Sequence, residues 1–237
     1  MTVLEARHVR KFYKGGAAPV LQDFNLSLQS GRIIGLLGPN GCGKTTFLKL
    51  VAGLLTSDGG EIAVCGIPVS EATKSLVSYL PERPYFTPGM KVRELLNYFA
   101  DFYADFDRAR AEQMLCDLQI DQNAILKQLS KGTKEKVQLV LVMARRARLY
   151  LLDEPIGGVD PASRDYILQT ILGNYAEDAT VVITTHLIYD IEPILDEFLF
   201  MGFGGQILKS GVADAVRAQH GCSLDQLFRE VFRCGSY

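Results

Sequence analysis

Residues 33–46 read Ile-Ile-Gly-Leu-Leu-Gly-Pro-Asn-Gly-Cys-Gly-Lys-Thr-Thr, and this stretch decides the fold. The apolar run 33–37 predicts a short buried strand, and residues 47–52 predict a helix. Between them lies a loop, 38–46, with the spacing G-x-x-x-x-G-K-S/T. A strand, a glycine loop and a helix in this order are typical of a site for the phosphates of a nucleoside triphosphate.

Each fixed position of this loop has a physical reason. Glycine lets the backbone curl with its N–H groups toward a polyanion, because no Cβ blocks the close approach. The helix that follows adds unpaired N–H groups and a partial positive charge. Lys44 can reach the outer phosphates, and the Thr45 hydroxyl can bind Mg²⁺. We therefore expect the whole loop to bind the nucleotide through Gly38, Pro39, Asn40, Gly41, Cys42, Gly43, Lys44, Thr45 and Thr46.

The composition of the chain limits the class of protein. Its 237 residues suit one large domain, or one domain with an inserted subdomain. The 25 Lys and Arg residues against 27 Asp and Glu give a formal net charge of −2, and we find no long basic run. We therefore predict no nucleic-acid partner. No apolar stretch approaches the ~20 residues that span a bilayer, and the N-terminus lacks a signal-peptide pattern, so we expect another chain to supply any membrane span.

The cysteines indicate a reducing compartment. They are odd in number and widely spaced: Cys42, Cys65, Cys116, Cys222 and Cys234. None belongs to a CxxC or Cys/His pattern of the zinc-binding kind. We interpret them as reduced thiols of a cytosolic protein. Because Cys42 lies inside the glycine loop, we also expect alkylation of its thiol to block nucleotide binding.

Two further strands are predicted near the N-terminus, over 3–8 and 21–28, from apolar residues that alternate with polar ones. The loop between them carries Tyr13, which no local pattern buries. Its ring can stack on a base or cover the edge of the sheet, and the local residues leave both interpretations open. After a turn at 57–60, residues 61–65 predict another strand.

The middle of the chain predicts a helical insert. The predicted strand 77–80 ends at Pro81-Glu82-Arg83-Pro84, where two prolines prevent a helix or sheet from continuing. From residue 92 to about 118 the sequence becomes helical and aromatic. We interpret its aromatic stripe as packing, and the preceding pair Tyr85-Phe86 as a candidate contact surface.

Two carboxylates follow a buried strand in the second half of the chain. Ser130 is placed to cap a helix that runs to about residue 146, and the apolar strand 149–152 then stops at Asp153-Glu154. Carboxylates at the end of a buried strand are costly unless a cation or a strong hydrogen-bond network meets them. Beside a phosphate loop, the cation that fits is Mg²⁺.

The C-terminal part predicts a helix over 164–172 and a buried strand over 180–185 that ends at His186. A hairpin follows, with strands at 197–201 and 206–209. The last helix begins at Ser223 as its N-cap, and because it is short we expect its apolar face to dock on its own domain or on a partner.

Taken together, these motifs resemble the nucleotide-binding subunit of an ATP-binding cassette (ABC) transporter. The motifs are the loop 38–46, Leu-Ser-Lys-Gly-Thr at 129–133, Leu-Leu-Asp-Glu-Pro at 151–155, Gly-Val-Asp-Pro at 158–161, and His186. The resemblance covers about 3–211 and implies an α/β fold, with a P-loop NTPase (RecA-like) core, an antiparallel β subdomain and an inserted α-helical subdomain. It implies one ABC ATPase domain over 1–237, with the core and β subdomain at about 1–83 and 147–211, the helical insert at 84–146 and a C-terminal helical tail at 212–237.

The resemblance also implies the roles of the site residues, with ATP and Mg²⁺ as ligands. In the family, the residues matching Asp153, Glu154 and His186 hold Mg²⁺ through water, activate the attacking water and contact the γ-phosphate. The chemistry agrees, because hydrolysis needs a base near the water and a metal on the outer phosphates. The candidate catalytic residues are Glu154, His186 and Lys44, the candidate metal ligands are Thr45, Glu82 and Asp153, and Tyr13, Ser130, Gly132 and Asp160 join the loop as candidate ATP-binding residues.

Tyr13 falls where the family places an aromatic residue that stacks on adenine, and no guanine-reading Asn-Lys-x-Asp segment is present, which favours ATP over GTP. Two positions depart from the family pattern. Glu82 replaces the usual glutamine, and Leu-Ser-Lys-Gly-Thr replaces Leu-Ser-Gly-Gly-Gln. Ser130 and Gly132 are kept, whereas Lys131 adds a charge that points to phosphate or to solvent.

The predicted helix after Ser130 also indicates a dimer. From 132 to 146 it would be roughly 22 Å long, with Ser130 at one end and the Asp153 strand at the other. Asp153 must lie beside Lys44, so Ser130 is too far to serve its own site. We predict a head-to-tail dimer with a second copy or a homologous ATPase subunit, with two ATP molecules between the subunits.

The predicted function is therefore an ATP-binding and ATP-hydrolysing subunit that powers transport through separate transmembrane partner subunits. Its expected location is cytoplasmic, peripheral on the inner face of the cell membrane, and the short cassette is similar to the bacterial exporter-type branch of the family. The alternative is a soluble ABC ATPase that acts as a regulatory or assembly factor on protein partners. A binding module without turnover is disfavoured because Glu154 and His186 are both present.

Overall fold

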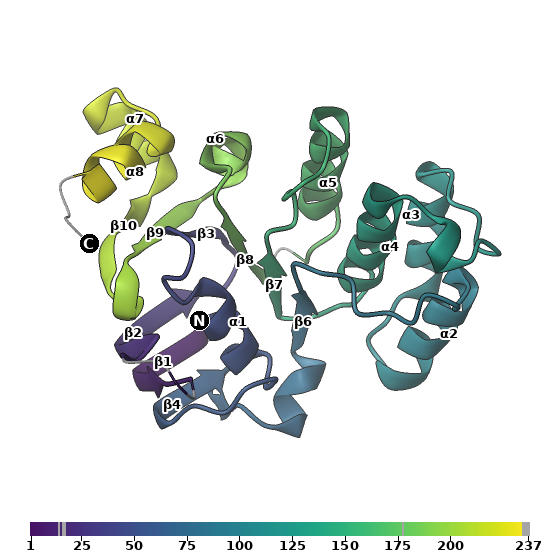
Figure 1. The fold of residues 1–237 in the computed structure, drawn as a ribbon, viewed down its shortest axis with the longest axis horizontal. Helices are drawn as coiled ribbons and strands as arrows, with labels where there is room; N and C mark the ends of the chain where they lie inside the picture. Colours follow the sequence, from purple (N-terminus) through teal and green to yellow (C-terminus); the bar gives the residue numbers. More distant parts are fainter. Residues whose placement is uncertain (14, 16–17, 177, 234–237) are drawn as a thin grey trace.

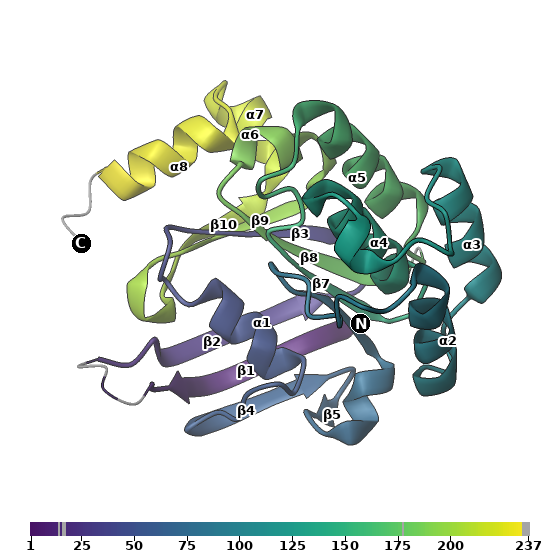
Figure 2. The same cartoon turned by 45° about the vertical axis from the view of Figure 1, so that its right-hand side comes forward.

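Two β-sheets form the body of the protein, and a group of helices extends from one side (Figure 1). The computed structural model describes residues 1–13, 15, 18–176 and 178–233. Figure 2 shows the larger and the smaller sheet one above the other, with α1, Lys44–Val51, between them. The α/β class predicted from the sequence is confirmed by this arrangement.

The larger sheet has the strand order β10-β9-β3-β8-β7-β6. Its parallel strands are β3 (Ile33–Leu37), β6 (Val77–Leu80), β7 (Leu149–Asp153), β8 (Thr180–Thr185) and β9 (Glu197–Met201), and β10 (Ile207–Val212) pairs antiparallel to β9. Every residue of β3, β7 and β8 is buried, as expected of parallel strands covered on both faces. Parallel pairing brings the carboxyl ends of these three strands to one edge of the sheet.

The smaller sheet is antiparallel and has the order β2-β1-β4-β5. Its strands are β1 (Thr2–Lys11), β2 (Leu21–Gln29), β4 (Gly59–Val64) and β5 (Ile67–Pro68). Phe24 of β2 packs on Phe47 of α1, with ring centroids 4.5 Å apart. This packing fixes the helix that follows the glycine loop between the two sheets.

The pairing of β1 with β4 corrects one prediction. The sequence places Gly59 and Gly60 in a turn, whereas both belong to β4. Gly60 has a φ of +76°, and a Cβ there would lie 2.3 Å from the carbonyl oxygen of His8. Glycine is needed because the two strands approach so closely at an irregular point of their pairing.

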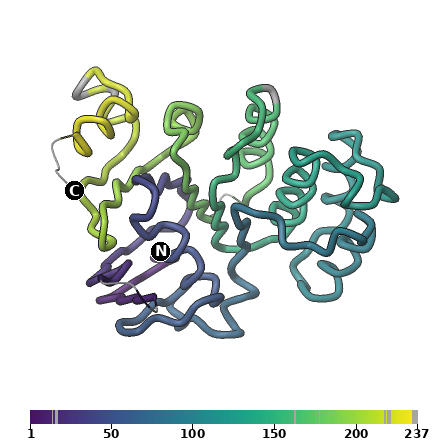
Figure 3. The backbone as a smooth tube through the Cα atoms, in the orientation of Figure 1, coloured from purple at the N-terminus to yellow at the C-terminus, as the bar shows by residue number. Residues whose placement is uncertain are grey.

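Helices are inserted between β6 and β7 and form the right-hand part of Figure 1, and of Figure 3 in the same orientation. They are α2 (Val92–Phe102), α3 (Arg108–Asp117) and α4 (Lys131–Met143), with short 3₁₀ turns at Glu71–Ser75 before β6 and at Leu126–Gln128 before α4. The predicted helical run 92–118 is therefore two helices. The break occurs because Asp107 caps α3, accepting a hydrogen bond at Oδ1 from the backbone N of Arg110 at 3.1 Å.

Arg145 joins these helices to the larger sheet. Its Nη1 donates to the carbonyl oxygen of Val77, the first residue of β6, at 2.7 Å, and its Nε donates to Asp105 Oδ1 at 3.2 Å. The guanidinium also lies 3.8 Å from the centroid of the Tyr103 ring. Arg145 is 2% exposed, so this joint is a fully buried cation with its charge and its donors satisfied.

The remaining helices are α5 (Pro161–Gly173), α6 (Ile188–Ile191), α7 (Ala213–His220) and α8 (Leu224–Arg233), with 3₁₀ turns at Glu192–Ile194 and Phe203–Gly205. The predicted cap of α8 is confirmed, since Ser223 Oγ accepts from the backbone N of Gln226 at 3.2 Å. Phe228 of α8 packs on Phe200 of β9, with ring centroids 5.3 Å apart, so the helix docks on its own chain. Helix α7 lies within the predicted helical tail 212–237, although the sequence pattern predicts no separate bounds for it. Cys234 and the end of the predicted tail, 234–237, lie outside the described residues.

Across the part of the chain that the structure describes, we find no helix that has both the length and the apolar character needed to span a bilayer.

Candidate functional site

The glycine loop joins β3 to α1 and depends on its glycines. Gly41 and Gly43 have φ values of +84° and +110°, which favour glycine. A Cβ on Gly38 would lie 2.2 Å from the carbonyl oxygen of Met201. Larger residues would therefore clash with the strands below or strain the backbone, and the loop keeps an open cradle above α1.

Lys44 is held inside this loop. Its Nζ donates to the carbonyl oxygen of Gly38 at 2.7 Å and to that of Pro39 at 3.1 Å. The residue is 7% exposed, so its position is fixed by the surrounding chain. Both oxygen partners are neutral, which leaves the positive charge of the ammonium to attract an anion. A lysine in such a cradle fits a phosphate group.

Asp153 ends β7 in a network of hydroxyl groups. Its Oδ1 accepts from Thr45 Oγ1 at 3.0 Å and from Thr184 Oγ1 at 2.7 Å, and its Oδ2 accepts from the Tyr79 hydroxyl at 3.4 Å. Burial, followed by the charge of Asp153, raises the pKa of Tyr79, so its phenol remains a donor. The carboxylate is 1% exposed and lies directly against the start of α1.

The pair Thr45 and Asp153 fits Mg²⁺, which prefers hard oxygen ligands. Among the described residues, no group of three or more His, Cys, Asp or Glu side chains is arranged to hold a metal ion.

Glu154 follows Asp153 but lies in different surroundings. It has a φ of +51°, an uncommon left-handed conformation for a non-glycine residue, and its backbone N donates to the carbonyl oxygen of Thr184 at 3.0 Å. Its Oε2 lies 3.0 Å from Nδ1 of His186, the first residue after β8. The strained turn thus leaves Asp153 buried at the end of β7 and directs the Glu154 carboxylate into the cavity, where it pairs with His186.

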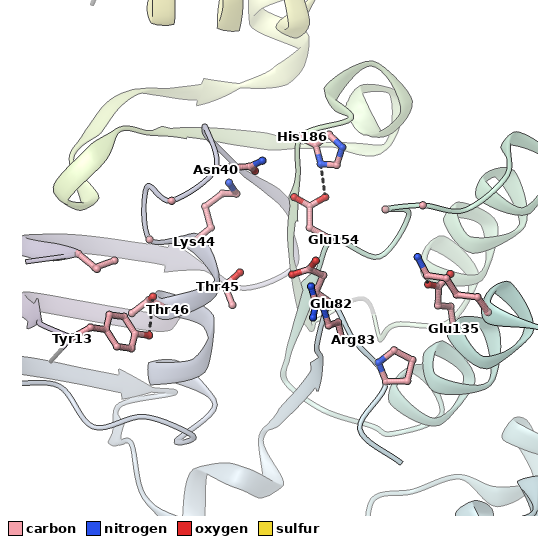
Figure 4. Close-up of a pocket in the computed structure, with 17 residues that line it drawn as sticks. Tyr13, Asn40, Lys44, Thr45, Thr46, Glu82, Arg83, Glu135, Glu154 and His186 are labelled. Carbon is pink, nitrogen blue, oxygen red and sulfur yellow. Dashed lines mark hydrogen bonds and ion pairs between the residues drawn. The ribbon is translucent and has the colours of Figure 1, made fainter. Parts of the chain in front are cut away.

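These groups surround a cavity of about 910 Å³. Figure 4 shows Lys44 and Thr45 on one wall, Glu135 of α4 on the opposite wall, and Glu154, His186 and Glu82 between them. The lining comprises Tyr13, Val20, Asn40, Gly41, Gly43, Lys44, Thr45, Thr46, Glu82, Arg83, Pro84, Lys131, Glu135, Glu154, Gly157, Gly158 and His186. Its volume lies within the range of small-molecule sites.

Tyr13 lies at the edge of the cavity, close to α1 (Figure 4). Its hydroxyl is 3.2 Å from Thr46 Oγ1, and 45% of the residue is exposed. The ring therefore has free surface beside the glycine loop, as a stacking residue needs. Residues 14, 16 and 17 of the same loop lie outside the described residues.

Cys42 occupies the opposite side of the loop from the cavity. Its side chain is fully buried, and a Cβ on Gly38 would lie 2.8 Å from its Sγ. Burial also raises the pKa of the thiol, which disfavours the reactive thiolate. Alkylation of Cys42 is therefore disfavoured in the folded protein, and its effect on nucleotide binding stays a prediction. The Sγ of this residue lies 4.0 Å from Lys44 Nζ, so its side chain packs beneath the lysine.

Some of the predicted site residues lie outside the cavity lining. Gly38 and Pro39 hold Lys44 from within the loop. Ser130 and Asp160 serve as helix caps, with Ser130 Oγ accepting from the backbone N of Thr133 at 3.1 Å and Asp160 Oδ1 accepting from that of Ser163 at 3.0 Å. Gly132, in the first turn of α4, is also outside the lining, although Lys131, which lies between Ser130 and Gly132, lines the cavity.

Sequence reasoning missed two supporting groups. Thr184 bonds Asp153, and the signal for it was a pair of threonines at the end of an otherwise apolar strand. Arg164 of α5 joins helix α6 to the loop after Glu154. Its Nη1 donates to Asp190 Oδ2 of α6 at 2.7 Å, and its Nε donates to the carbonyl oxygen of Val159 in that loop at 3.1 Å. No spacing in the sequence pairs these residues, because the contacts depend on the fold.

A family model described as ABC transporter matches residues 21–157 of this chain. Three relatives carry similar names. The ABC transporter ATP-binding protein YtrB of Bacillus subtilis is 33% identical over 84% of this chain and 68% of its own length. The Nod factor export ATP-binding protein I of Cupriavidus pinatubonensis is 30% identical over 95% of this chain and 71% of its own length. An uncharacterized ABC transporter ATP-binding protein of Synechocystis is 29% identical, and this chain spans 66% of its length.

The fold has close counterparts among solved structures. An ATP-binding subunit of an ABC transporter superposes with a TM-score of 0.85 at 28% identity, over 97% of this chain and 99% of the other. A nucleotide-free ATP-binding cassette superposes with a TM-score of 0.78 at 21% identity, which supports the fold alone. The predicted P-loop NTPase fold is confirmed by these likenesses. The chain therefore belongs to the ABC transporter family, as one of its ATP-binding ATPase subunits.

Proposed function

We propose that this ATPase subunit powers transport across a membrane through separate transmembrane partner subunits, and that it works as half of a head-to-tail dimer on the cytoplasmic side. One observation carries the proposal: Lys44, the Thr45–Asp153 pair and the Glu154–His186 pair line or adjoin a single cavity, whereas Ser130 lies outside it. The chain has the parts for hydrolysis, but Ser130 and Gly132 do not line the cavity with them.

Substrate binding is assigned to the glycine-loop wall. The backbone N–H groups of 38–46 and the ammonium of Lys44 bind the phosphates of ATP, and Tyr13 stacks on the adenine. Thr45 and Asp153 hold Mg²⁺, with Glu82 at the cavity as a third oxygen donor. Bound there, Mg²⁺ neutralises charge on the outer phosphates.

The chemical step is assigned to Glu154 and His186. Glu154 accepts the proton of the attacking water at a carboxylate oxygen, as general-base catalysis requires. The contact between Glu154 Oε2 and His186 Nδ1 holds the carboxylate in the cavity, and the other ring nitrogen of His186 is left to contact the terminal phosphate. Neither side chain is far from solvent, since 15% of the Glu154 and 56% of the His186 side chain is exposed.

The position of α4 supports the proposed dimer. With 13 residues, the helix is about 20 Å long, and Ser130 caps the end that faces away from the joint at Arg145. Ser130, Gly132 and Asp160 are therefore proposed to meet the ATP of the facing subunit, which is a second copy or a homologous ATPase subunit.

The proposed contact with transmembrane partners lies at the start of the helical insert. Tyr85 is 60% exposed, and its ring packs 4.4 Å from that of Phe86, which in turn touches α2 through Phe99. An exposed aromatic on a packed base is typical of a contact surface. The relatives named for Nod factor export support the exporter-type branch, and we extend that to this chain as part of the proposal. We likewise propose one ABC ATPase domain with the limits given above.

The experiment is a copurification combined with an assay. The tagged chain, expressed in cells that supply its membrane partners, should copurify from detergent extracts with multi-span subunits and release phosphate from ATP. A Tyr85→Ala variant should lose the membrane subunits and keep ATP binding, whereas Tyr189→Ala, which removes an exposed tyrosine of α6, should keep both. Stable association with soluble proteins alone would contradict the transport proposal and favour an assembly factor.

A further inference from the structure

The first turn of α4 carries a second lysine toward the cavity. Lys131 and Glu135 both line it, and Figure 4 shows Glu135 on the wall opposite Lys44. The two residues are one helical turn apart, and Lys131 Nζ lies 3.7 Å from Glu135 Oε1. Neither has a role in the reaction as proposed above.

Both charges are poorly compensated in this arrangement. Glu135 Oε2 is buried and, among the described residues, finds no hydrogen-bond partner. Burial raises the pKa of Glu135, because its ionised form loses hydration. The separation of 3.7 Å exceeds that of a charge-assisted hydrogen bond, and lysine placed before glutamate at this spacing is the weaker orientation. Lys131 is also the first residue of α4, where the helix dipole disfavours a cation.

The loop after Glu154 leaves room for the Lys131 ammonium. Gly158 has a φ of +72°, and a Cβ there would lie 2.9 Å from Lys131 Nζ. The lysine side chain is 75% exposed, so little packing holds it in this place. The ammonium therefore rests between α4 and the loop without a strong partner, and a phosphate would offer it one.

We propose that Lys131 is a second phosphate-binding lysine, which rests between Glu135 and Gly158 while the subunits are apart and binds the terminal phosphate of ATP in the facing subunit when the dimer closes. The proposal rests on the head-to-tail dimer described above. Glu135 competes with the phosphate for the ammonium. Glu135 is thus a counter-ion that weakens closing of the dimer relative to a chain that has Lys131 but no carboxylate at position 135.

The test measures ATP-driven dimerisation by sedimentation, with Glu154→Gln as the parent because slow hydrolysis preserves the closed state. Adding Lys131→Gln should raise the dimer dissociation constant about tenfold. Adding Glu135→Gln should lower it about threefold, since the competing charge is gone. Glu135→Gln should have no effect once Lys131 is also replaced. Lys127→Gln, which removes an exposed lysine of the same insert outside the cavity, should leave the dimer unchanged.

ATP binding to the monomer, followed at low protein concentration with a fluorescent ATP analogue, should be the same in the parent and in Lys131→Gln. An equal loss of monomer affinity would assign Lys131 to its own cavity and overturn the proposal, and so would an unchanged dimer. If Lys131→Gln unfolds, Lys131→Arg must dimerise like the parent, because it keeps the charge. A parent that binds ATP and stays monomeric at saturating ATP would contradict the dimer itself, and this proposal with it.

Discussion

The two walls of the cavity carry one lysine each and hold it in opposite ways. Lys44 is 7% exposed and bonded to two carbonyl oxygens of its own loop, whereas the Lys131 side chain is 75% exposed and stands 3.7 Å from its nearest charge. The glycine-loop wall is thus organised before any ligand arrives, which lowers the cost of binding. The α4 wall, by contrast, leaves the position of the Lys131 ammonium adjustable. Such a difference suits a site in which the glycine-loop wall binds the nucleotide and the α4 wall changes its contacts in response.

The largest expected effect separates the chemical step from ATP binding at the glycine-loop wall. Glu154→Gln should lower the hydrolysis rate by about 10²–10⁴-fold, because a general base contributes this much. ATP affinity should stay the same, since Lys44 and the glycine loop are untouched. Phosphate release and equilibrium ATP binding check the two parts. A loss smaller than tenfold would remove Glu154 from the role of base.

The next effect concerns Arg145, the joint that connects α4 and its wall of the cavity to the larger sheet. Arg145→Leu should lower the free energy of unfolding by about 3–5 kcal/mol, because it leaves Asp105 and the carbonyl of Val77 without their buried partner. Urea unfolding measures this loss. Arg148→Leu is the matched control, since its ion pair with Asp178 is exposed and should contribute less than about 1 kcal/mol. Equal losses in both variants would contradict the assigned joint.

A smaller effect tests the hydroxyl network under the glycine-loop wall. Thr184→Val removes a donor to Asp153 and should cost about 1.5–3 kcal/mol, the range for hydrogen bonds to charged groups. We expect the Mg²⁺ concentration for half-maximal hydrolysis to rise roughly tenfold. Thr180→Val, at the other end of the same strand, should leave the Mg²⁺ requirement unchanged. The idea fails if both variants behave alike in a Mg²⁺ titration.

On the adjustable wall, removal of the α4 cap should have a modest effect. Ser130→Ala loses the bond from the backbone N of Thr133 and should cost about 1 kcal/mol, seen as a Tm lower by about 2–4 °C. Ser130→Asp, which keeps a capping oxygen, should recover this stability. A Tm for Ser130→Ala equal to wild type would show that the cap is not needed for α4.

The smallest effect is a dependence on pH. The pKa of Glu135 is raised in the folded chain by burial, so the ionised form destabilises the fold. This deficit is absent below the ordinary glutamate pKa of about 4.3, grows as the pH rises through the raised value, and is complete above it. Glu135→Gln should therefore raise the Tm near neutral pH and have no such advantage in acid. Thermal unfolding at several pH values checks the sign, and an advantage that grows in acid would contradict it.

The elements that build the site were predictable because their signals are local. β3, β6 and β8 begin and end at the predicted residues, since each is a mainly apolar run followed directly by a glycine, a proline or a polar residue. The caps Ser130 and Ser223 were readable for the same reason. Near neighbours in the sequence decide both kinds of feature.

What the sequence did not show depends on distant contacts. Asp153 finds Tyr79 and Thr184 only after β6, β7 and β8 pair, and Gly60 belongs to a strand because His8 of another strand lies against it. The direction of Cys42 within the loop is likewise set by the strands below. Pattern alone places a residue in a motif but does not say which way its side chain points.

The joint at Arg145 also has a mechanical meaning. It lies where β6 and β7 begin, the edge of the sheet opposite Asp153 and Thr184, and α4 runs from it toward Ser130. A helix about 20 Å long that pivots at one end magnifies a small rotation: a turn of about 10° moves the far tip by about 3 Å, a full hydrogen-bond length. Arg145 is thus the pivot of α4, and contacts can be gained or lost at the Ser130 end of the helix while the buried cation hardly moves.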